Sequence, residues 1–95
     1  MITAIVNVRC EVDRIPEIAE TIARLPGVTE VYSVTGDIDL VAMVRVREHD
    51  DLADAIAGRL NKVPGVLSTD THIAFRTYSR YDVEAAFSIG LEDGL

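Results

Sequence analysis

Aromatic side chains are scarce in this chain, which has no Trp, three Tyr and two Phe. Proteins that bind single-stranded nucleic acids stack the bases on such rings. Positive charge is also in deficit, because nine Lys and Arg stand against sixteen Asp and Glu and leave a formal net charge of −7. Affinity for a phosphate backbone comes from Lys and Arg. The composition therefore argues against direct binding to nucleic acid.

Long apolar runs and paired cysteines are missing too. No run approaches the roughly 20 residues that span a bilayer, and no basic amphipathic stretch suits a membrane surface. The start of the chain, Met1 followed by a strand-like pattern, is not typical of a signal peptide. The single cysteine, Cys10, cannot form an internal disulfide, which suits a reducing compartment. We therefore expect a cytoplasmic protein without a membrane partner.

Aliphatic residues are abundant, and hydrophobic residues of all kinds make up 48% of the 95 positions. A chain of this length fits one domain with a single modest core. Apolar and polar residues alternate over 2–10, which is the period of a strand with one buried face. Two further strands are predicted over Val28–Val34 and Ile38–Val46, joined by a tight turn. A fourth, longer strand is predicted from Val66 to Ser79.

Two helices are predicted between these strands. After Asp13, which we expect to cap the first helix, apolar residues follow a spacing of three and four until Pro26 and Gly27 end it. The second helix is expected to begin at its cap, Asp50, and to end before Pro64.

The predicted order is strand, helix, strand, strand, helix, strand, and the two halves echo each other in Arg24–Val28 and Lys62–Val66. Such a duplication gives an α+β, ferredoxin-like βαββαβ sandwich, in which two helices cover one face of a four-stranded antiparallel sheet. We assign this domain to residues 1–80. Residues 81–95 form a tail whose apolar residues recur at helical spacing, which predicts a short C-terminal helix.

The sheet face away from the helices carries apolar residues as well. Val41 and Met43 point to this open face if their neighbours on the strand face the helices, and Ile5 and Val34 join them there. Strands that are apolar on both faces need cover on both, and a twofold homodimer supplies it with one self-complementary patch. The alternative is that these four residues are scattered surface hydrophobics.

The stretch from Val34 to Leu40 is the most informative one for function. A hairpin turn explains Gly36 and Asp37 by backbone geometry alone. It does not explain Asp39, which alternation places on the open face with Asp37. Two carboxylates beside a glycine turn are suited to holding the ammonium group of an amino acid, while free backbone N–H groups receive its carboxylate. A turn with a ligand and a turn without one both stay open at this point.

Hydroxyl and imidazole groups on the fourth strand are the other candidates. Thr69 and Thr71 share one face, where they complete a polar site or simply reflect the preference of threonine for strands. His72 lies on the opposite face, and neither it nor His49 has a partner at metal-ligand spacing. No nucleophile motif, phosphate-binding glycine loop or Cys/His cluster is present. We therefore expect no metal, no cofactor and no enzymatic activity.

Three segments, Leu25–Val28, Val34–Leu40 and Gly65–Thr71, together resemble the C-terminal effector domain of the Lrp/AsnC regulators, and the resemblance covers residues 2–80. It implies a domain that dimerises through its sheet and assembles into a ring of dimers, an octamer being one such ring, with an amino acid bound between dimers. The ligand contacts that the resemblance implies are Tyr32, Thr35, Gly36, Asp37, Asp39, Thr69 and Thr71.

The chain departs from full-length members of that family because nothing like a helix-turn-helix precedes the first strand. It is interpreted as a stand-alone effector domain. Three roles then stay open: buffering an amino acid, forming mixed assemblies with full-length regulators, or modulating an enzyme. Two alternatives to sensing also stay open. One is an assembly module without a ligand, and the other is a small dimeric, cofactor-free monooxygenase-like enzyme whose base would be His72 facing the helices.

Overall fold

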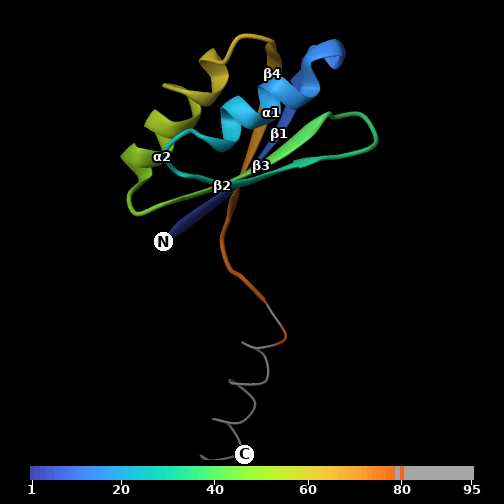
Figure 1. The fold of residues 1–95 in the computed structure, drawn as a ribbon. Helices are drawn as coiled ribbons and strands as arrows, with labels where there is room; N and C mark the ends of the chain where they lie inside the picture. The colour runs from blue at the N-terminus through green and yellow to red at the C-terminus, as the bar shows by residue number, and fades with distance from the viewer. Residues whose placement is uncertain (79, 81–95) are drawn as a thin grey trace, which may run out of the picture.

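A four-stranded antiparallel sheet and two helices make up the fold in a computed structural model, which describes residues 1–78 and 80 (Figure 1). The strand order is β2-β3-β1-β4, so the first and third strands are central, as a ferredoxin-like sandwich requires. The strands are β1 (Ile2–Cys10), β2 (Val28–Ser33), β3 (Leu40–Val46) and β4 (Val66–Ala74). The helical elements are η1 (Val12–Arg14), α1 (Ile15–Ala23), α2 (His49–Ile56) and η2 (Leu60–Lys62). The predicted α+β class and element order are confirmed.

The core lies between the sheet and the two helices, which share one side of it (Figure 1). Every second residue of β1 from Ala4 onward is buried, and so are Leu40, Ala42 and Val44 of β3. Against them pack Ile18 and Ile22 from α1 and Leu52 from α2. The apolar residues at a spacing of two in the strands and of three to four in the helices therefore pack together in one layer.

The ends of several elements differ from the sequence prediction. No side chain caps α1, whose N-cap is Arg14 rather than Asp13, because the 3-10 turn η1 leads into it. The cap of α2 is Glu48 rather than Asp50, and its side chain forms a capping box with Asp51. The second helix also ends early, at Ile56, because Gly58 is a poor helix former, and η2 then completes this face of the core.

Strand ends differ for a second reason, the availability of a partner strand. The fourth strand stops at Ala74 rather than Ser79, where its pairing with β1 ends at the partners Thr3 and Ala74. The hairpin between β2 and β3 is also longer than a tight turn, with residues 34–39 outside the strands. The predicted C-terminal helix lies outside the described residues.

The buried position of Ile22 predicts a large loss of stability in an Ile22→Ala variant. Its side chain is fully buried, so we expect the free energy of unfolding to fall by about 2–5 kcal/mol. Urea unfolding followed by circular dichroism measures the change. Val12→Ala is the control, because Val12 is 75% exposed and should change stability by less than about 0.5 kcal/mol. Similar losses in both variants would contradict this placement of the core.

Candidate functional site

The hairpin loop 34–39 is closed by a hydrogen bond between its two ends and tied to β1 by another. The backbone N–H of Val34 donates to the carbonyl oxygen of Asp39 over 3.1 Å, and the N–H of Asp39 donates to the carbonyl of Val8 over 3.0 Å. Gly36, at the exposed tip, has a φ of +110°, a conformation that side chains rarely adopt. The loop therefore presents its tip from a rigid base.

Asp39 is part of that base. Its carboxylate Oδ2 accepts the backbone N–H of Cys10 over 2.9 Å, at the point where the pairing of β1 with β4 shifts register. The sequence prediction placed Asp39 beside Asp37 as a ligand contact, and it missed this bond. The structure gives Asp39 a role in holding the hairpin against β1.

Cys10 itself packs as a small apolar side chain and is only 2% exposed. Burial raises the pKa of its thiol, and the nearby negative charges of Asp39 and Glu11 raise it further. The thiol therefore stays protonated and unreactive at neutral pH, which leaves packing as its role.

Thr35 and Asp37 are exposed on either side of Gly36. Within residues 1–78 and 80, neither side chain makes a hydrogen bond or an ion pair, and no backbone N–H between 35 and 38 donates to another backbone group. Such a loop offers a carboxylate, a hydroxyl and several N–H groups to a partner from outside.

The two threonines lie on β4, which β1 separates from the hairpin strand β3. Thr69 stands opposite Val8 and Thr71 opposite Val6. Both threonines therefore lie on the edge strand β4 and on the helix-covered face of the sheet. The hydroxyl of Thr69 donates to Asn61 Oδ1 over 2.7 Å, and Thr71 lines an apolar hollow of about 330 Å³ between α2 and β4. Among the described residues, the hollows lined by Thr69 and by Thr71 contain no residue of the loop 34–39.

Tyr32 is the remaining predicted contact. It stands opposite Val41 on the open face, near the β2 edge, and is 49% exposed. A hydrogen bond with the Glu30 side chain raises the pKa of its hydroxyl, so the phenol stays neutral at physiological pH.

The open face has an apolar centre. Met43 and Ile5 are register partners there and are half-buried, as are Val41 and Val34. His72 pairs with Ile5 and so lies on this face rather than toward the helices. Its Nε2 is 3.1 Å from Asp70 Oδ2, and both side chains are largely exposed. The expectation that His72 could face the helices as a base is wrong, because alternation along β4 puts it on the opposite side.

In the described part of the chain, no group of His, Cys, Asp and Glu is arranged to hold a metal ion. No helix among those residues has the length and apolar character needed to cross a membrane.

Comparison with known proteins first defines a class, that of transcription regulators. PF1734, an uncharacterised HTH-type transcriptional regulator of Pyrococcus furiosus, is 37% identical over 73 residues, which are 77% of this chain and 49% of that one. The chain spans about half the length of the curated relatives it matches. The family model of the Lrp/AsnC ligand binding domain matches residues 3–83, and the chain belongs to this family. The family and these relatives are regulators, not enzymes.

Solved structures support the same fold. TTHA0845 from Thermus thermophilus superposes with a TM-score of 0.78 and 46% identity, covering 84% of this chain and all of that one. The regulator NMB0573 from Neisseria meningitidis, solved as an L-Met complex, superposes with a TM-score of 0.74. At 15% identity, over 83% of this chain and 53% of that one, it shows the fold alone.

The bond from Cys10 to Asp39 predicts that the two simplest substitutions of Asp39 differ. Asp39→Ala leaves a partly buried N–H without a partner and should cost about 1–3 kcal/mol in the free energy of unfolding. Asp39→Asn keeps an acceptor oxygen and should cost less. Urea unfolding of both variants tests the ranking, and equal stability of Asp39→Ala and the unmodified chain would contradict this role.

Proposed function

We propose that this chain is the amino-acid-sensing and oligomerisation unit of a transcription regulator of the Lrp/AsnC type. The observation that carries the proposal is the rigid hairpin loop, whose exposed carboxylate, hydroxyl and N–H groups have no partner among the described residues. A free amino acid carries both an ammonium and a carboxylate. Asp37 complements the first of these, and the loop N–H groups with Thr35 complement the second.

A second copy of the chain completes the site in this proposal. The threonines lie on β4, which β1 separates from the hairpin strand β3, and in this proposal they reach the ligand from a neighbouring subunit. Thr71 and Thr69 of one copy would then close the site around the loop of the next. Tyr32 and Asp39 contribute from the hairpin side, Asp39 chiefly by holding the loop in place. Such contacts link dimers into a ring, and a ring of four dimers is an octamer.

The dimer itself is proposed to form through the open face. One register row across the sheet runs Glu30, Met43, Ile5 and His72, with apolar residues in the middle and ionisable ones at the edges. A twofold axis over the middle of this row places Met43 and Ile5 against their copies. It also brings Glu30 of one subunit toward His72 of the other. Val41 and Val34 extend the apolar centre.

An amino acid is the first ligand to try, and L-Met is one of the candidates because a regulator of the same fold was solved with it. Full-length regulators of the same family are proposed as partners, because their own effector domains share this fold and would present the same open face.

Addition of the right amino acid should raise the melting temperature of the assembled protein, because a ligand that binds the native state alone stabilises it by mass action. Each of the twenty amino acids is added separately at saturation and unfolding is followed by calorimetry. Asp37→Ala should reduce the shift, by the part that binding at the hairpin loop contributes, without lowering the basal melting temperature. Asp13→Ala removes an exposed aspartate elsewhere and should leave the shift intact. If no amino acid shifts the melting temperature, the sensing proposal is wrong, and the alternative of an assembly module without a ligand is favoured.

If a second copy covers the open face, a charged side chain in its apolar centre should disrupt the dimer. Met43→Lys should separate the dimer, and the melting temperature, which rises with protein concentration in an obligate dimer, should then lose that dependence. Val12→Lys is the control, because Val12 is exposed on η1 outside the sheet. If Met43→Lys keeps the concentration dependence of the unmodified chain, the dimer does not form through this face.

A further inference from the structure

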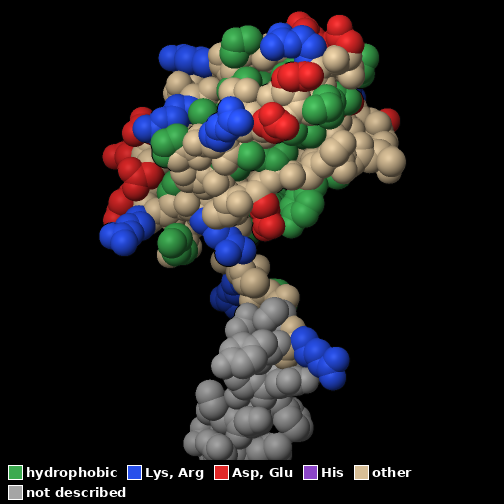
Figure 2. Space-filling view, in the orientation of Figure 1, with side chains coloured by type: hydrophobic (Ala, Val, Ile, Leu, Met, Phe, Trp, Pro, Cys, Tyr) green, Lys and Arg blue, Asp and Glu red, His purple; other side chains and the backbone are tan. Residues whose placement is uncertain are grey.

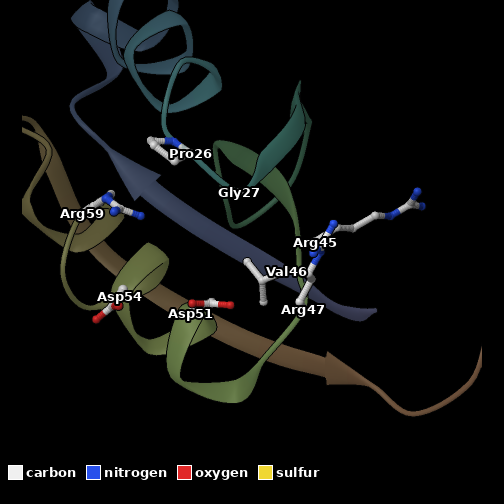
Figure 3. A pocket seen from close by; sticks show the side chains of 8 residues that line it. All are labelled: Pro26, Gly27, Arg45, Val46, Arg47, Asp51, Asp54 and Arg59. Carbon is white, nitrogen blue, oxygen red and sulfur yellow. The ribbon is translucent and has the colours of Figure 1, made fainter.

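An open hollow of about 320 Å³ lies at the end of the sheet opposite to the hairpin loop, and it gathers charges of both signs (Figure 3). Its walls come from the turn between α1 and β2, the end of β3, and α2 with the turn that follows it. The volume is at the lower end of the roughly 300–1,000 Å³ typical of small-molecule sites. The charged residues around it are Arg45, Arg47, Arg59, Asp51 and Asp54.

These five charged side chains do not pair with one another. Among residues 1–78 and 80, none of the five takes part in an ion pair, although they surround one hollow. Figure 3 shows the Arg59 side chain reaching into the space between Pro26 and α2, whereas Arg45 extends away from it. Arg45 stands opposite Thr3, so its side chain belongs to the open face. The guanidinium of Arg59 is therefore the cation best placed to meet a ligand.

Asp51 is the best oriented of the acidic groups. Its Oδ2 accepts the backbone N–H of Glu48 over 3.3 Å, while the Glu48 side chain accepts the N–H of Asp51 in return. This capping box fixes the carboxylate on the first turn of α2 and leaves Oδ1 available. The backbone of Arg59 precedes η2, and its carbonyl accepts the N–H of Lys62 over 3.1 Å.

The floor of the hollow includes Gly27, where a larger residue would not fit. Gly27 has a φ of +92°, and a Cβ built on it would come within 3.2 Å of Val46 Cγ1. Its carbonyl accepts the N–H of Arg45 over 2.8 Å, which ties the α1–β2 turn to β3. The wall with Pro26 is thus held against the end of β3.

We propose that this hollow is a second small-molecule site, separate from the hairpin loop, and that it binds a zwitterion of the α-amino acid class. Arg59 receives the carboxylate in a two-pronged hydrogen bond, and Asp51, with Asp54 behind it on α2, receives the ammonium group. A simple anion would meet two carboxylates and a simple cation would meet the arginines. Only a ligand with both charges satisfies both walls.

Backbone amide spectra of the isotope-labelled full chain test this site. L-alanine is the zwitterionic probe, and propionate and ethylamine each carry one of its two charges. L-alanine should shift the signals of Gly27 and Arg59 at concentrations where the other two compounds do not. Arg59→Gln and Asp51→Asn should each weaken this response about tenfold, equivalent to about 1.4 kcal/mol. Asparagine keeps an acceptor for the capping box, so Asp51→Asn should still fold. Arg76→Gln and Asp13→Asn are the matched controls, because neither residue lines the hollow.

The same titration in an Asp37→Ala background separates this site from the one on the hairpin. The response of Gly27 and Arg59 should persist there, whether or not the loop binds an amino acid. Three results would overturn the proposal: shifts confined to residues 34–39, loss of the Gly27 response in Asp37→Ala, or an equal response to propionate alone, which would indicate a plain anion site.

Discussion

Two helices can shield only one face of a four-stranded sheet, and the central strands of this sheet are apolar on both. On the helix side Ala4 and Leu40 are completely buried, whereas Ile5 and Met43 on the other side are left half-buried. In the orientation of Figure 1, with α1 and α2 in view, apolar side chains also reach the surface among charged ones (Figure 2). Within the described residues no third layer covers the open face, so a second copy of the chain is the cover that the proposed function requires.

Much of the fold could be predicted from the sequence, because alternation and helical spacing are local signals that also mark the buried face. The open-face positions of Val41 and Met43 follow from the burial of Leu40 alone. Element ends were harder to predict. Asp13 and Asp50 are both good caps, yet the structure uses Arg14 and Glu48. Which of several neighbouring residues begins a helix depends on the preceding turn, and where β4 ends depends on its partner strand.

The candidate site was predictable only in part. Glycine and aspartate at a hairpin tip predicted an exposed polar loop, and Gly36 and Asp37 form one. Asp39 was assigned to the ligand because nothing in the sequence shows that the N–H of Cys10, twenty-nine positions away, needs an acceptor. The charged hollow beside Arg59 was missed for the same reason. Its residues come from three separate segments, and only the packing of α2 against β3 brings them together.

Cover of the open face by a second copy is the central claim, and the molar mass of the unmodified chain in solution tests it most directly. Light scattering over a dilution series, with and without a mixture of the twenty amino acids, measures that mass. The account predicts a multiple of the 10.4 kDa chain that is even in number and that changes in size when the amino acids are added. A monomer at every concentration would contradict it, because the apolar centre of the sheet would then face water.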